Sequence, residues 1–200
     1  MTVFTFPATV FPSKARWVPQ ANTQTFTSPL DRTTQTTSLP GMRWLANLEF
    51  TNLLAAEHGE LSALMIRLRG SYGRFWLPNH SRPVPMGTAA GYPNVSGGGQ
   101  TGAALATSGW VAYQTVLKAG DYIAVNGEFK AVVADANSDG SGMATLLIEP
   151  PLRASPPNGA VIVTDHPMCL MRLTSDDAFQ SEGRGGFIFD ASFSCVEAFS

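Results

Sequence analysis

The stretch YIAVNGEFKAVV, residues 122–133, decides the fold of this chain. Two short apolar segments, Tyr122–Val125 and Phe129–Val133, flank the pair Asn126-Gly127. A two-residue hairpin turn needs a positive φ at both central positions, and Asn followed by Gly tolerates this well. We therefore predict a β-hairpin at this point of the chain.

Further short strands are predicted on both sides of this hairpin. They are separated by clusters of Gly, Pro, Asn and Ser, such as Asn137–Gly142 and Pro150–Gly159, which favour turns. Five or six short strands within about 70 residues are typical of a small β-barrel or sandwich. The additional strands are expected at Trp110–Val116, Met143–Ile148 and Val161–Val163.

The N-terminal part of the chain contains one strand and one helix with clear patterns. Met42–Phe50 alternates between apolar and polar residues, which predicts a half-buried strand. Asn52–Arg69 has helical periodicity; Thr51 or Asn52 can cap its start, and Gly70 can end it. One amphipathic helix cannot form a core alone, so we expect it to lie on a sheet. Its apolar stripe consists of Leu54, Leu61, Leu64, Met65 and Leu68.

Other segments of the chain are less regular. Residues 28–40, SPLDRTTQTTSLP, have almost no large apolar side chain and are interpreted as an exposed arm or hairpin. Residues 78–109 are rich in Gly and Pro and are expected to form a long loop. Tyr72–Leu77 predicts a short aromatic strand, and Gly186–Ser194 predicts a terminal strand that pairs with the N-terminal part.

These patterns predict a mostly β protein with a split organisation. Residues 1–95 and 175–200 are expected to form an N-terminal β domain that carries the helix. Residues 96–102 are expected to form a linker, and residues 103–174 to form a small β-barrel inserted between the two parts. The chain length of 200 residues suits one large domain or two small ones.

The composition favours a protein that lies against other protein chains. Charged residues make up only 14% of the chain, and the net charge is −2. A low charge content suits interfaces, whereas a nucleic-acid binder would show a basic face. No signal peptide and no membrane span is expected, which predicts folding in a cytoplasm.

Two sequence motifs suggest ligand sites, but we interpret the first as part of a linker and the second as a turn. Gly97–Gly102 fits G-x-G-x-x-G, yet turn residues precede it and no helix pattern follows, so a dinucleotide site is not expected. Asp135–Gly140 fits the first half of a calcium loop, but the twelfth position is Leu146 where a Glu is needed. Asp and Asn also favour turns by binding nearby backbone N–H groups.

Residues with other catalytic or metal-binding chemistry are scattered along the sequence. His58, His80 and His166 have no zinc-like spacing, so no metal site is predicted. No nucleophile elbow is present, and we expect neither a catalytic residue nor a cofactor, and therefore no enzyme. Cys169 and Cys195 lie in apolar segments and are interpreted as reduced, buried thiols. The carboxylates of Asp176 and Asp177, which are adjacent in sequence, are expected to diverge.

Four tryptophans are assigned to core positions, with sugar stacking as the alternative. They are Trp17, Trp44, Trp76 and Trp110.

Two long segments resemble a family of phage proteins. The first is NTQTFTSPLDRTTQTTSLPGMRWLANLEF, followed by the helix that ends in IRLRGSYGRFWL. The second is LKAGDYIAVNGEFKAVVADANSDGSGMATLLIEPPLRASPPNGAVIVTDHPMCLMRL. Over nearly the whole chain, the sequence is similar to the distal tail proteins, or minor tail-tip structural proteins, of long non-contractile-tailed phages (siphophages).

The resemblance implies a fold and a role in the virion tail. It implies a split N-terminal β domain and a second, OB-like or galectin-like barrel. It also implies a six-fold ring of identical subunits that joins the tail tube protein to the hub or baseplate protein, with tail fibres or the tape measure protein as further partners. DNA would pass through this ring without specific binding, and the ring would assemble in the bacterial host cytoplasm.

Two other functions compete with this interpretation. A carbohydrate-binding module used in host recognition would bind sugar as a monomer and would need no ring. A hydrolytic tail enzyme would need convergent carboxylates or a nucleophile triad, which the sequence does not suggest. The exposed Thr-rich segment at 22–40 favours the ring, because a ring subunit must reach its neighbour.

Overall fold

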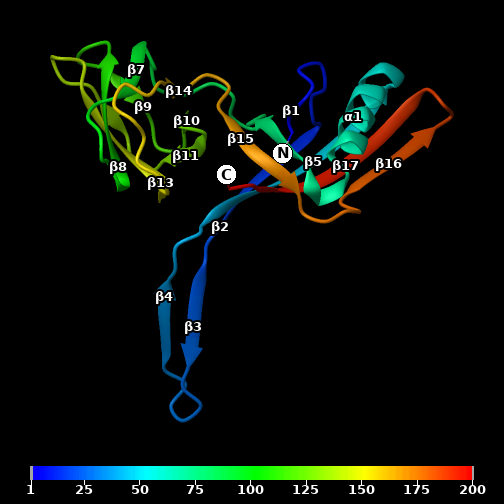
Figure 1. Ribbon diagram of the computed structural model, residues 1–200, viewed down its shortest axis with the longest axis horizontal. Helices are drawn as coiled ribbons and strands as arrows, with labels where there is room; N and C mark the ends of the chain where they lie inside the picture. Colours follow the sequence, from blue (N-terminus) through cyan, green and yellow to red (C-terminus); the bar gives the residue numbers. More distant parts are fainter. Residues whose placement is uncertain (1, 200) are drawn as a thin grey trace.

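Strands β5 (Arg43–Leu54) and β17 (Ile188–Glu197) lie side by side in a seven-stranded sheet in the computed structural model, which describes residues 2–199 (Figure 1). The alternation predicted for β5 is confirmed, because Trp44, Ala46, Leu48 and Phe50 are buried and the residues that alternate with them are more exposed. The strand order is β1 (Val3–Thr5), β6 (Arg74–Pro78), β15 (Met168–Leu173), β17, β5 and β2 (Lys14–Gln20), with β16 (Phe179–Arg184) also paired to β17.

One face of this sheet is covered by the only α-helix of the described residues, α1 (Ala55–Leu68). Its buried side chains are Leu61, Leu64, Met65 and Leu68, as the apolar periodicity predicted. Leu54, in contrast, is exposed. The helix packs on the sheet and contributes to its core, as expected for an amphipathic helix.

The helix ends differ from the prediction. Strand β5 continues to Leu54 because its last residues still pair with β17, so neither Thr51 nor Asn52 caps the helix. Leu54 is the N-cap, and the Glu57 carboxylate accepts a hydrogen bond from the Leu54 backbone N–H at 2.9 Å. Arg69, with φ 54°, and not Gly70, ends the helix in the left-handed conformation.

The hairpin predicted at Asn126-Gly127 is confirmed. It joins β10 (Tyr122–Val125) to β11 (Glu128–Val132), and both turn residues have positive φ, 49° and 77°. Around it lies a barrel-like sheet of six strands. Their order is β14 (Ile162–Val163), β10, β11, β13 (Ala144–Leu152), β8 (Gly102–Trp110) and β7 (Gly91–Val95), and a bridge between Asn94 and Val161 nearly closes the sheet.

The strand positions of the barrel differ in part from the prediction. Residues 102–109 were expected to lie in a loop, yet with Trp110 they form β8, which is stabilised by pairing with β13. The strand predicted at Trp110–Val116 is interrupted by a turn: Trp110 ends β8, and pairing resumes only at β9 (Thr115–Leu117), which pairs with β12 (Ala136–Asn137). Ala- and Gly-rich strands carry a weak local signal, because tertiary pairing decides their conformation.

The pairing also shifts the expected boundaries between the two β structures. Residues 96–102 were expected to form a linker between domains, but residues 96–101 are a hairpin loop that connects β7 to β8 within the barrel, and Gly102 begins β8. Strand β15 was assigned to the barrel, but it pairs with β6 and β17 of the large sheet. Short apolar strands look alike in both β structures, and only their pairing partners distinguish them. The coarser prediction, a mostly β chain with an inserted barrel, is confirmed.

A separate two-stranded ribbon projects from the large sheet (Figure 1). It consists of β3 (Thr23–Thr27) and β4 (Thr34–Ser38), continues the β2–β5 pair, and is called the arm below. Its base is closed where the Asn22 side chain donates to the Pro40 carbonyl and the Leu39 N–H donates to the Asn22 carbonyl. Among residues 2–199, no helix is long and apolar enough to cross a membrane.

Candidate interaction surfaces

The barrel is fixed to the large sheet by an aromatic cluster. On β11, Phe129 points out of the barrel and belongs to the core of the large sheet. Its ring lies 5.2 Å from that of Trp17 and 5.6 Å from that of Trp44, and it stacks on Tyr122 at 5.2 Å. The Trp44 indole N–H also donates to the Phe129 carbonyl at 3.2 Å. The aromatic rings therefore make one continuous core across the boundary.

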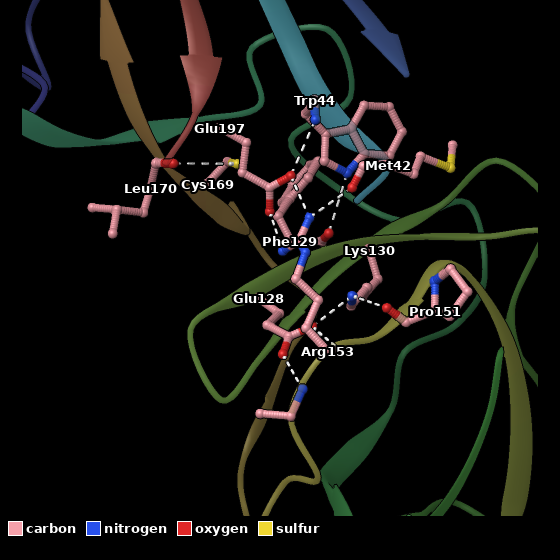
Figure 2. A network of polar contacts seen from close by, with 11 residues as sticks. Met42, Trp44, Glu128, Phe129, Lys130, Pro151, Arg153, Cys169, Leu170 and Glu197 are labelled. Atoms are coloured by element: carbon pink, nitrogen blue, oxygen red, sulfur yellow. Dashed lines mark hydrogen bonds and ion pairs between the residues drawn. The ribbon is translucent and has the colours of Figure 1, made fainter. Parts of the chain in front are cut away.

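A buried ionic network lies next to this cluster (Figure 2). The Glu197 carboxylate on β17 accepts two hydrogen bonds from the Arg153 guanidinium, at 2.7 and 2.8 Å, and one from the Trp44 backbone N–H at 3.1 Å. Arg153 follows the barrel strand β13, so the ion pair joins the barrel to the sheet. Bidentate pairing of this kind is strong because two parallel hydrogen bonds share the charge.

The second ion pair of the network lies on the barrel side. Lys130 is fully buried; its ammonium donates to the Pro151 carbonyl at 2.8 Å and lies 2.6 Å from the Glu128 carboxylate. Burial lowers the pKa of Lys130, and Glu128 opposes this shift. Burial raises the pKa of Glu128, but the hydrogen bonds from Lys130 and from the N–H groups of Arg153 and Ala154 outweigh it, so the net pKa is lowered. Glu128 and Lys130 are two residues apart, but Trp44, Arg153 and Glu197 are far apart in the chain, so no local sequence pattern indicated the network.

The two loops that resemble ligand motifs are occupied by internal hydrogen bonds. In the Gly97–Gly102 loop, the Gln100 side chain donates to the carbonyls of Ser96 and Ala106 and accepts from the Ala106 N–H. A strand, and not a helix, follows this loop. In the calcium-like segment, Asp135 accepts from the Ala119 N–H, whereas Asp139 accepts from the N–H groups of Ser141 and Met143. The Gly97–Gly102 segment is a hairpin loop, where a linker was predicted. In the Asp135–Gly140 segment, Ala136–Asn137 forms β12, and a turn follows in which the Gly142 N–H donates to the Asp139 carbonyl, so the turn prediction is confirmed only for the second half.

The histidines have different environments. The His58 ring stacks on Phe189 at 4.1 Å and its Nε2 hydrogen-bonds Ser181 at 2.6 Å. His80 packs edge-on between two phenylalanines, and burial, followed by the nearby charge of His166, lowers its pKa. The structure thus brings His80 and His166 near each other, which their sequence spacing did not suggest. Within residues 2–199, no three His, Cys, Asp or Glu side chains form a group that could hold a metal ion.

The remaining candidates are structural. Cys169 and Cys195 are buried, unpaired thiols, as predicted, and burial raises the pKa of both. Asp176 accepts hydrogen bonds from the N–H and hydroxyl of Ser71, whereas Asp177 accepts from Ser175, so the two neighbouring carboxylates have separate partners.

The tryptophans do not share one environment. Trp44 and Trp110 are buried, as predicted for core residues. Trp17 packs against the Phe129 ring. Trp76 is only partly buried and lines a surface groove, which the assignment of all four tryptophans to the core did not anticipate.

Within residues 2–199, three surface features have no partner. The first is the arm, in which every residue of both strands is exposed. The second is a groove of about 360 Å³ between the barrel and the large sheet. It is lined by Trp76, Ala124, Asn126, Gly127, Val161, Val163 and Met168.

The third feature is the face of the large sheet opposite the helix. Two adjoining hollows of about 470 and 500 Å³ cross it over β2, β5, β17 and β16. Charged residues of both signs lie there; Lys14 and Glu49 form an exposed ion pair at 3.1 Å. The polar side chains of this face include Arg16, Asn47, Gln180, Ser192 and Ser194.

Comparison with known proteins adds no assignment to these surfaces. No protein-family model and no curated protein matches the sequence.

Proposed function

We propose that this protein is a structural subunit of a phage tail tip, which forms a ring that joins the tail tube to the hub or fibre assembly. The proposal rests on the sequence resemblance to siphophage distal tail proteins and on one structural observation, the arm. All ten residues of β3 and β4 are exposed, and the two strands pair only with each other. An isolated two-stranded hairpin is marginally stable in water, so an arm of this kind needs a neighbouring chain.

The polar face of the large sheet supports the same role. A ring through which DNA passes needs an inner wall that does not hold phosphate groups. The hollowed face carries Lys14 and Arg16, but Glu49 and Glu182 lie on the same face, so it offers no uniform basic patch. Affinity for DNA depends on the number of phosphates that Lys and Arg neutralise, and a mixed face neutralises few.

The rigid junction between barrel and sheet fits a part that carries load. Because aromatic rings and the Arg153–Glu197 pair cross the boundary, the barrel keeps a fixed orientation on the sheet. In a ring, six such barrels would stand at fixed positions around the outside. Fibres or other tail-tip proteins can then attach to the barrels, and the ring remains the scaffold.

The mass of the purified protein in solution tests this proposal. At a few micromolar, light scattering or native mass spectrometry should show a species near six times the 21.3 kDa subunit, and electron microscopy should show a ring with a central opening. Tail tube protein added to the sample should promote this species if the ring closes only on the tube. A monomer that stays monomeric with tail tube protein present would contradict the proposal.

A carbohydrate-binding module remains the second candidate, because two tyrosines of the barrel are exposed. Tyr92 and Tyr113 are 92% and 84% exposed, and aromatic faces of this kind stack on sugar rings. They follow Ala90 and Val111, which are joined by a backbone hydrogen bond from the Val111 N–H to the Ala90 carbonyl. A glycan-binding screen of the monomer, repeated with Tyr92→Ser and Tyr113→Ser, distinguishes the two functions. Binding that is lost in both variants would favour the module.

A further inference from the structure

The two faces of the arm differ in chemistry. Residues directly opposite each other in an antiparallel pair point to the same face, and successive residues point to opposite faces. The register pairs Thr25 with Thr36 and Phe26 with Gln35. One face therefore carries only hydroxyl side chains, those of Thr23, Thr25, Thr27, Thr34, Thr36 and Ser38, whereas the other carries Gln24, Phe26, Gln35 and Thr37.

The face with Phe26 has the composition of a contact surface. Phe26 is 63% exposed in the chain, and Leu30 at the tip of the arm is 96% exposed. Interfaces are typically centred on a few aromatic or large apolar side chains that enter pockets on the partner. The hydroxyl face has no such anchor and is well solvated by water. The arm thus has one face suited to a protein and one suited to solvent.

The groove between barrel and sheet has matching chemistry. Its lining comes from both β structures, with Trp76 on β6 and Met168 on β15 facing Val161 and Val163 near β14. Val161 is 70% exposed and adds to the apolar surface of the groove, and contiguous apolar surface of this kind marks interaction sites. Asn126 and the indole N–H of Trp76 are its only hydrogen-bonding side-chain groups. A sugar needs several such groups, so the lining fits an apolar protein side chain better.

The arm cannot fill the groove of its own chain. It leaves the sheet in a direction away from the barrel, as Figure 1 shows, and the groove lies where barrel and sheet meet. The arm of a second copy of this chain is not held in that direction, so it can reach the groove of the first copy. Contacts between two different patches on identical subunits are heterologous, and such contacts build rings or filaments.

We infer that the Phe26 face and Leu30 of the arm dock into the groove lined by Trp76, Val161, Val163 and Met168 on a second copy of this chain. Repetition of this contact from subunit to subunit would close the ring, and this step rests on the proposed function. The hydroxyl face of the arm stays free.

Disulfide trapping between two variants tests the contact directly. Chains carrying Leu30→Cys are mixed with differently tagged chains carrying Val161→Cys, and diamide is added as the oxidant. Cys169 and Cys195 are buried, so the introduced thiols are the ones that react. The matched control replaces Val161→Cys by Tyr113→Cys, at an exposed barrel position outside the groove. We expect a mixed disulfide between Leu30→Cys and Val161→Cys chains well above the control.

Two adjacent residues of the arm provide a second test. Phe26→Ser should weaken self-association by about tenfold or more, because truncation removes an interface anchor. Thr25→Ser, one residue away on the opposite face, should change association less than about twofold. A control-level disulfide, or equal effects of the two substitutions, would overturn the inference. The mass of the same samples with tail tube protein present reports separately on the ring: a disulfide without a six-subunit species under that condition would contradict the proposed function and keep the arm contact.

Discussion

The arm and the junction between barrel and sheet are both connected to strand β5, yet they are stabilised in opposite ways. At one end of β5, Trp44 is buried against Phe129 and hydrogen-bonds Glu197. A few residues earlier, β4 has no buried residue at all. The junction obtains its stability within the chain, whereas the arm must obtain it from a partner. The comparison teaches that burial within one subunit can change over a few residues where a scaffold turns into a contact surface.

Removing the Phe129 ring should have the largest effect on this comparison. Phe129→Ala deletes a fully buried ring that contacts three aromatic side chains, which should lower the free energy of unfolding by about 3–5 kcal/mol. Urea unfolding followed by tryptophan fluorescence measures this change. Phe26→Ala is the matched control, because it deletes the same ring from the arm and should change monomer stability by less than about 0.5 kcal/mol. Equal losses in both variants would contradict the contrast between the regions.

The charge of Glu197 should have the next largest effect. Glu197→Gln keeps the side-chain shape but removes the charge that Arg153 faces at 2.7 Å, which should cost about 2–3 kcal/mol of unfolding free energy. The control is Glu49→Gln, whose exposed pair with Lys14 should contribute less than about 1 kcal/mol. Urea unfolding at neutral pH compares the two variants. If Glu197→Gln is as stable as Glu49→Gln, the ion pair does not hold the barrel on the sheet.

Deleting the arm should have almost no effect on the stability of the monomer. Replacing residues 23–38 by Asn-Gly joins Asn22 to Leu39, which are already hydrogen-bonded across the base of the arm. Because no residue of β3 or β4 is buried, thermal unfolding should occur within a few degrees of the full chain. The same variant should fail to assemble. A large loss of thermal stability would show that the arm packs on its own subunit.

The same contrast explains what could be predicted from the sequence. The Asn126-Gly127 hairpin, the buried helix stripe and the exposed Thr-rich arm were predictable, because turn chemistry and periodicity act over a few residues. The membership of β15 and the hairpin loop at 96–102 were predicted wrongly, because sheet pairing is set by distant partners. The Arg153–Glu197 pair spans 44 residues of sequence, so no local pattern could have indicated it.

The smallest predicted effect is a pH-dependent change at the tip of the arm. The tip is the part of the arm that has hydrogen bonds between its own side chains. Asp31 is exposed, yet its pKa is lowered to about 2 by hydrogen bonds from the Ser28 hydroxyl and from the N–H and hydroxyl of Thr33. A carboxyl whose pKa is lowered stabilises the folded tip above its ordinary pKa of 3.8, and this contribution is lost as the pH falls towards about 2.

We therefore expect the Thr33 amide resonance to titrate with a midpoint near 2 in an NMR experiment, and the tip to loosen over the pH range between about 4 and 2. The rest of the chain should keep its spectrum at the upper end of this range, because the turn lies far from both cores. Asp31→Asn is the control and should abolish the titration at Thr33. A midpoint near the ordinary value would mean that the tip has no fixed structure, and that the arm presents Leu30 to its partner only after binding.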